Sequence, residues 1–167
     1  MKYFRYFLIG GLALGLSANR SGTTQPSEGI YPGDLFADVK NLENISGTKI
    51  SLSDLKGQKV LVNLWAAYDA PSHRDNVLYA NAIQKNEYPV KMISMSFDES
   101  ESVYERTVLM DKIDKRYQFW VDKPERANLF SYYRLDRGFR SYLIDEHGKI
   151  IAVNPTTEDL DQLLKDN

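Results

Sequence analysis

The spacing of apolar and polar positions predicts an α/β domain. Two apolar, β-branched runs, 60–65 and 90–97, are typical of central strands buried on both faces. Apolar residues spaced three to four positions apart predict helices over 69–86 and 101–115. The remaining predicted elements are a hairpin within 40–52, a strand at 118–121, a helix at 124–133, strands at 141–144 and 149–153, and a last helix opening at 156–159. This order predicts a central mixed β-sheet flanked by helices.

The same spacing predicts which side chains each helix buries. The core face of the first helix is expected to consist of Val77, Leu78, Ala82 and Ile83. The second helix is expected to use Tyr104 with Val108 and Leu109 with Ile113, and the last one Leu160, Leu163 and Leu164. Pro71 fits a helical first turn, where its missing N–H costs nothing, and Thr156 fits an N-cap.

Three segments are predicted along the chain. Residues 1–18 have the pattern of an export signal or N-terminal anchor, with Lys2 and Arg5 before a short apolar run at 8–16. The run is shorter than the roughly 20 residues that span a bilayer. Residues 19–30 are polar and rich in turn formers, which favours a flexible linker, and 31–167 form one domain. The protein is therefore expected to be exported, to the periplasm or cell envelope, and membrane-bound only if the signal segment stays uncleaved.

Charge and cysteine content exclude several functions. A net charge of −2 does not favour nucleic-acid binding, which usually needs a basic surface. The chain contains no cysteine, so it forms no disulfide. Residues 16–19 are similar to a bacterial lipoprotein box in which Asn19 replaces the cysteine, so lipidation at Asn19 is excluded.

Three stretches resemble exported thioredoxin-like oxidoreductases of the TlpA/ResA type, which are related to the redoxins. Residues 60–74 resemble the family's strand and the start of its active-site helix, Trp-Ala-x-Trp-Cys-x-Pro-Cys-Arg. Residues 50–57 resemble the segment before that strand, and 142–150 resemble the hairpin Phe-Leu-Ile-Asp-x-x-Gly-x-Ile. The resemblance implies a thioredoxin-like fold with an N-terminal β-hairpin extension.

The resemblance also shows what is missing. Asp69 and Ser72 stand at the family's two cysteine positions, and Phe139 stands at or near its cis-proline. Thiol–disulfide exchange requires thiolate attack on a disulfide sulfur. The sequence therefore predicts a redox-inactive member with no catalytic residue of that type and no cofactor.

Two functions remain open for the former redox positions. Asp69 is expected to cap the helix, with contact to a ligand as the alternative. An enzyme with non-thiol chemistry at Asp69, Ser72 and His73 is the alternative to a binding role, although consecutive helical residues such as Ser72 and His73 point to different faces. Asp69 and His73 at i,i+4 are too few ligands for a structural metal site, and none is predicted.

Aromatic and arginine side chains favour the binding role. The resemblance brings Trp65, Tyr68, Phe139 and Tyr142 to one end of the fold, and aromatic residues and arginine are enriched at binding surfaces. The predicted binding residues are Trp65, Tyr68, Asp69, His73, Arg137, Phe139 and Arg140, with Arg74 as a further donor. The alternative is that Trp65 and Tyr142 belong to the core. The predicted function is protein or peptide binding, or scaffolding, with an exported protein or peptide as partner.

Overall fold

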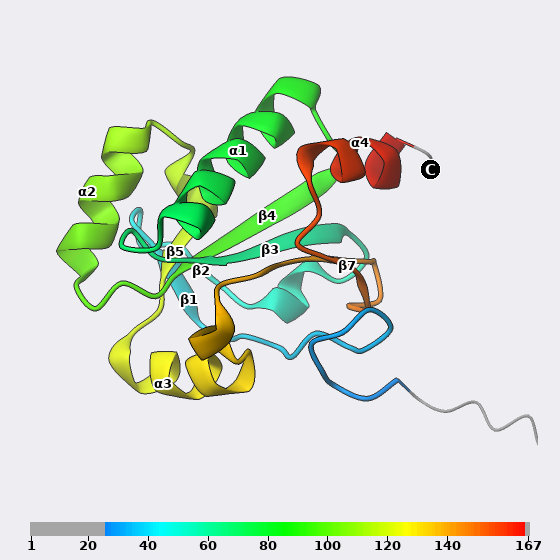
Figure 1. Cartoon of the computed structure of the whole chain (residues 1–167), viewed down its shortest axis with the longest axis horizontal. Coiled ribbons are helices and arrows are strands. Elements are labelled where there is room, and N and C mark those ends of the chain that lie inside the picture. The colour runs from blue at the N-terminus through cyan, green and yellow to red at the C-terminus, as the bar shows by residue number, and fades with distance from the viewer. Residues whose placement is uncertain (1–25, 166–167) are drawn as a thin grey trace, which may run out of the picture.

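The computed structural model describes residues 26–165, in which one mixed sheet is flanked by helices (Figure 1). The sheet has seven strands in the order β2-β1-β5-β4-β3-β6-β7. Their bounds are β1 Leu42–Asn44, β2 Lys49–Ile50, β3 Lys59–Trp65, β4 Val90–Ser96, β5 Gln118–Trp120, β6 Ser141–Ile144 and β7 Ile150–Val153. The predicted α/β architecture and the N-terminal hairpin, β1–β2, are confirmed. The signal segment and most of the predicted linker lie outside the described residues.

Four α-helices cover the sheet unequally. They are α1 Ala70–Asn86, α2 Glu101–Asp111, α3 Lys123–Tyr132 and α4 Thr157–Lys165. Figure 1 shows α1, α2 and α4 on one side of the sheet and α3 on the other. Short 3-10 turns, η1 Leu52–Leu55, η2 Lys115–Tyr117 and η3 Leu135–Arg137, complete the order.

The central strand β3 supplies side chains to both faces. Val62 and Leu64 pack in the cluster that includes Leu129 and Tyr133 of the α3 side. Leu61 packs in the opposite cluster with Tyr79 of α1, and every residue of β3 is buried. This burial on both faces explains why the strand is a continuous apolar run.

Strand direction positions the functional end of the fold. β3, β4 and β5 are parallel, so Trp65, Ser96 and Trp120 all come to the same end of the sheet. β6 runs antiparallel to β3 and begins at that end, with Ser141 opposite Asn63. The loops that follow the parallel strands therefore meet there, which is where open α/β sheets bind ligands.

Several helix details differ from the prediction. Leu78, Leu109 and Leu163 were expected in the core but are 47%, 63% and 36% exposed. The sheet-facing side of α1 instead buries Ser72, Asn76 and Tyr79. Asn76 bonds to Asn63, Ser94 and Gln118 on the sheet, so this part of the interface is polar and apolar spacing could not reveal it. The other predicted residues, Val77, Ala82 and Ile83, are partly buried against the apolar clusters.

Two boundaries also differ. α2 ends at Asp111, because Lys112 takes a left-handed conformation with φ 57°. Ile113 is buried as predicted, but it lies in the loop after the helix and not in the helix itself. Before Tyr31, Gly29 N donates to Leu35 O at 3.0 Å and Ile30 is 6% exposed. The packed domain therefore includes the last residues of the segment predicted as linker.

Candidate functional site

Asp69 is the N-cap of α1. Its backbone is extended, with φ −101° and ψ 94°, and its carboxylate Oδ2 accepts a hydrogen bond from Ser72 N at 3.0 Å. A cap of this kind stabilises a helix by about 1 kcal/mol, and a carboxylate also complements the positive end of the helix dipole. The predicted capping role is present at the position where the resemblance expects a nucleophile.

The Ser72 hydroxyl is hydrogen-bonded within the same turn. The side chain is 6% exposed, and its hydroxyl donates to Asp69 O at 3.1 Å and accepts from Ala66 N at 3.4 Å. The serine thus ties the start of α1 to the loop that leaves β3. A hydroxyl held by two backbone groups is not activated by a base.

His73 lies against α2 rather than beside Ser72. Its Nε2 is 2.6 Å from Asp111 Oδ2, and its ring stacks on Trp65 with 5.6 Å between ring centroids. The contact with Asp69 is the backbone bond of the helix, His73 N to Asp69 O at 3.0 Å. The structure therefore assigns His73 to the α1–α2 contact, and its imidazole is directed to Asp111.

Asp98 is a buried carboxylate at this end of the sheet, and it is not among the site residues predicted from the sequence. It is 2% exposed, and its two carboxylate oxygens accept from Ala67 N at 3.0 and 3.1 Å, while Oδ2 also accepts from Ser96 Oγ at 2.7 Å. Its backbone carbonyl accepts from Trp120 Nε1 at 2.9 Å and from the Arg126 guanidinium. Asp98 therefore braces the loops after β3, β4 and β5. Its place after a buried parallel strand was the one available sequence signal.

Phe139 packs in the region where the family places its cis-proline. The residues described contain no cis peptide bond, and Gly138 before it takes φ 107°. The ring of Phe139 lies 6.1 Å from that of Tyr68 and 5.8 Å from that of Phe97, centroid to centroid. Aromatic packing has thus taken the place of a proline-shaped backbone.

Tyr68 is the most exposed aromatic side chain of this region, at 67%. Partial burial raises its pKa, and the carboxylates of Asp98 and Asp69 raise it further. The phenol therefore stays neutral at physiological pH, with an apolar edge against Phe139 and a polar tip in solvent. We call the pair Tyr68 and Phe139 the aromatic ledge.

The remaining predicted binding residues separate into core and surface. Trp65 and Tyr142 are fully buried, in different clusters, so both belong to the core, as the alternative reading expected. Arg74 pairs with its neighbour Asp75 at 2.7 Å. Arg137 is exposed and Arg140 is half-buried, where its charge opposes the burial-driven rise in the pKa of Tyr142.

The fold and this altered site agree with the comparisons to known proteins. The sequence profile of the Redoxin family matches residues 32–164. The chain belongs to the Redoxin family. It is 30% identical over 135 residues to the thioredoxin-like protein YneN of Bacillus subtilis, covering 77% of this chain and 74% of that one. It is 29% identical over 137 residues to the thiol-disulfide oxidoreductase ResA of Bacillus cereus, covering 73% and 75%.

Solved structures give the same assignment. A thioredoxin-like protein from Parabacteroides distasonis matches with a TM-score of 0.71 at 35% identity, over 84% of this chain and 99% of that one. The thioredoxin domain of a thiol-disulfide oxidoreductase from Bacteroides vulgatus matches with a TM-score of 0.69 at 21% identity, over 80% and 95%, which supports the fold alone. This redoxin therefore keeps the thioredoxin-like fold and lacks cysteine altogether.

Residues 26–165 contain neither a candidate metal cluster nor a candidate membrane-spanning helix. No three His, Asp or Glu side chains in this range gather in a way that could hold a metal ion. None of the helices in the range is long and apolar enough to cross a membrane.

Proposed function

We propose that this redoxin is a redox-inactive, exported binding domain that holds an extended segment of a partner protein across the aromatic ledge. One observation carries the proposal. The side chains at the two redox positions are bonded within the domain, whereas Tyr68 next to them is 67% exposed against Phe139.

Redox inactivity follows from the covalent bond that a dithiol reductase has to form. A dithiol reductase must form a mixed disulfide, and neither the carboxylate of Asp69 nor the hydroxyl of Ser72 can do so. With no cysteine anywhere in the chain, no second site can supply the sulfur.

The binding role is supported by the aromatic ledge and by the arginine side chains near it. Aromatic rings offer large contact area with little conformational entropy to lose, and arginine adds hydrogen-bond donors. Arg137 and Arg140 flank Phe139 in sequence, on the segment that leads into β6. An extended partner segment there would meet both rings and both guanidinium groups.

Export is supported by the sequence of residues 1–18, and the absence of a lipidated cysteine favours a free or signal-anchored protein in the periplasm or cell envelope. Detection of the protein in the periplasmic fraction of its own host, after spheroplasting, supports this part. Retention in the cytoplasmic fraction contradicts it.

Crosslinking tests the ledge. A photoreactive group introduced by Tyr68→Bpa (p-benzoylphenylalanine) is expected to trap a defined partner in cell envelopes, and the trapped species should disappear when Phe139→Ala is added. Tyr132→Bpa, at a tyrosine that is 40% exposed on α3, is the matched control for a surface tyrosine outside the ledge. Equal trapping from both positions would contradict the proposal. Insulin reduction by the purified domain is expected to stay at the buffer rate.

The enzymatic alternative at Asp69, Ser72 and His73 remains a separate prediction. The hydrogen bonds of the described residues hold Ser72 to backbone groups and His73 to Asp111, and do not join the two side chains. An activity found in a broad hydrolase screen and lost in an Asp69→Asn, His73→Ala variant that still folds would establish it in place of the binding role.

A further inference from the structure

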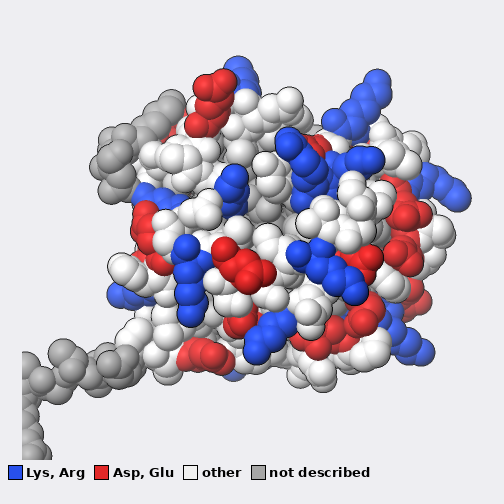
Figure 2. Space-filling model, turned by 180° about the vertical axis from the view of Figure 1, so that it is seen from behind, with Lys and Arg blue, Asp and Glu red and all other residues white. Residues whose placement is uncertain are grey.

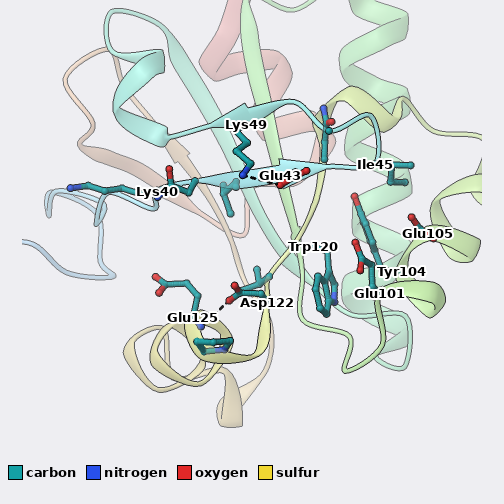
Figure 3. Close-up of a pocket in the computed structure, with 16 residues that line it drawn as sticks. Lys40, Glu43, Ile45, Lys49, Glu101, Tyr104, Glu105, Trp120, Asp122 and Glu125 are labelled. Carbon is teal, nitrogen blue, oxygen red and sulfur yellow. Dashed lines mark hydrogen bonds and ion pairs between the residues drawn. The ribbon is translucent and has the colours of Figure 1, made fainter.

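A second surface of the molecule, away from the aromatic ledge, carries more acidic than basic side chains. It is a cavity of about 630 Å³ between the β1–β2 hairpin, the start of α2 and the loop from β5 into α3, and we call it the hairpin groove (Figure 3). Its charged lining residues are Glu43, Glu101, Glu105, Asp122 and Glu125, with Lys40 and Lys49. Neither Tyr68 nor Phe139 lines it.

The negative charge of the groove is local. Its lining carries five acidic and two basic side chains, a formal −3, while the whole chain carries −2. The rest of the protein therefore sums to +1. Viewed from behind, acidic side chains crowd the side of the molecule formed by α2 and α3, on the right of Figure 2.

Helix dipoles reduce this charge without cancelling it. α2 and α3 both start at the groove, and acidic residues at helix starts have a structural role there. The positive ends of two helices contribute about +0.5 each, so about −2 remains. Glu43 and Glu105 lie outside those first turns and are not explained by the dipoles.

Basic partners within the domain are also too few. Lys49 is 3.3 Å from Glu43, and Lys40 extends away from the carboxylates (Figure 3). The ion pairs among residues 26–165 include none with the other four acidic side chains of the groove. Asp122 uses its Oδ1 to cap α3, accepting from Glu125 N at 3.1 Å, and keeps Oδ2 for another donor. The carboxylates of Glu101, Glu105 and Glu125 accept no hydrogen bond among residues 26–165, so they are available to a cation from outside.

Trp120 lies between the two groups of acids. Glu101 and Glu105 lie on its α2 side, and Asp122 and Glu125 lie on its α3 side (Figure 3). Its indole is fixed by the bond from Nε1 to Asp98 O at 2.9 Å, and the Arg126 guanidinium lies over the ring at 6.0 Å. The indole thus already accepts one guanidinium of the protein itself, as tryptophan rings commonly do.

We propose that the hairpin groove binds an arginine-bearing extended segment of a partner protein, with one guanidinium at each pair of acids and the chain crossing Trp120. Arginine fits better than a compact ammonium because its planar fork matches carboxylate geometry and stacks on an indole. The cavity lies within the range of sites that enclose organic ligands. This proposal does not depend on the aromatic ledge.

Fluorescence anisotropy tests it with the full-length protein. A short labelled peptide with two arginines is expected to bind at low salt, and the same peptide with glutamates is not. Losing two carboxylate contacts of the size of exposed ion pairs, in Glu101→Gln, Glu105→Gln, should weaken binding about five- to tenfold. The charge-matched control is Glu146→Gln, Glu158→Gln, which also removes one helix-start acid, in the first turn of α4. It should change binding less than about twofold.

Three further results decide between occupants. Trp120→Phe, with folding checked by circular dichroism, should weaken the arginine peptide more than a lysine peptide of the same length. Equal loss in the groove variant and in the charge-matched control would show long-range charge attraction and overturn the site. Spermidine displacing the peptide at equal concentration, or binding as tightly, would assign the groove to small polyamines and overturn the proposed partner.

Discussion

The former redox site and the hairpin groove lie at the same end of one sheet and have opposite chemical states. At the former redox site, Asp69 and Ser72 are bonded within the domain, and little remains to react. In the groove, Glu101, Glu105 and Glu125 have neither an ion pair nor a side-chain hydrogen bond within the described residues, and Asp122 uses only Oδ1, which caps α3. Polar side chains at a ligand-binding end of a fold therefore do not by themselves mark a site. A site is indicated only where such side chains still have donors or acceptors that are not bonded within the domain.

Asp98 connects the two regions. Its carboxylate holds the Ala67 amide beside the former redox site, and its carbonyl holds Trp120 of the groove. The two surfaces are therefore expected to respond together when this residue changes, and separately when others do.

The largest expected effect is that of Asp98→Ala. Removal of the carboxylate leaves the partly buried Ala67 N–H and the buried Ser96 hydroxyl without their acceptor, at a cost of about 3 kcal/mol in the free energy of unfolding. Urea denaturation measures it, and Glu99→Ala at the exposed next position should change stability by less than about 0.5 kcal/mol. A loss below about 1 kcal/mol would show that the brace is not structural.

Removing the hydroxyl group from each of two buried tyrosines should change the free energy of unfolding by an intermediate amount, in opposite directions. Tyr104 under the groove donates to Gln118 O at 2.6 Å, so Tyr104→Phe should lower the free energy of unfolding by about 1 kcal/mol. The hydroxyl of Tyr133, on the α3 face, has no hydrogen-bond partner among the described residues. Tyr133→Phe should therefore be neutral or stabilising by up to about 1 kcal/mol. Similar losses in both variants would contradict this assignment.

The same tyrosines predict alkaline sensitivity. Burial raises the pKa of Tyr104 and of Tyr133, and Glu105 and Glu101 raise that of Tyr104 further. Each phenol is bound more tightly to its proton in the folded state, so its contribution is complete below the unfolded pKa of about 10 and is lost as the pH rises above it. Between pH 8 and pH 11, the fall in thermal unfolding temperature should be smaller for the Tyr133→Phe variant than for the unchanged protein.

The smallest effects compare one acid from each surface. Asp69→Ala removes the N-cap of α1 and should cost about 1 kcal/mol in the free energy of unfolding. Glu105→Gln in the groove should change stability by less than about 0.5 kcal/mol, because Glu105 forms no ion pair among residues 26–165. Chemical denaturation of both variants tests the comparison, and an equal cost for the two acids would remove the distinction between a used and an unused carboxylate.

The pattern along the chain located most elements, and the exceptions have a common cause. The apolar runs of β3 and β4 were predicted within a residue because both faces of those strands are buried. The buried face of α1 was predicted wrongly at Leu78, because part of its contact with the sheet consists of hydrogen bonds from Asn76 to Gln118 and between Tyr79 and Ser141. Apolar periodicity cannot indicate a helix face that is buried and polar.

Asp98 and the hairpin groove could not be predicted for a related reason. Their residues come from segments around 43, 101 and 122 that are far apart in the chain. Only the pairing of β1 with β5 brings Glu43 opposite Trp120 and thereby closes the groove. The sequence offered acids at helix starts, whose ordinary explanation is the helix dipole.

The amino-acid sequence by itself determined the α/β fold, the family resemblance, the cap at Asp69 and the absence of cysteine, because each depends on local patterns or on composition. Tertiary structure alone decided which polar groups are already bonded. His73 contacts Asp111, and Asp98 is buried and bonded to the neighbouring loops. Four of the five groove acids have no ion pair among residues 26–165. Hydrogen bonds and ion pairs between distant segments depend on distances of a few ångströms, and only the packed sheet and helices set those distances.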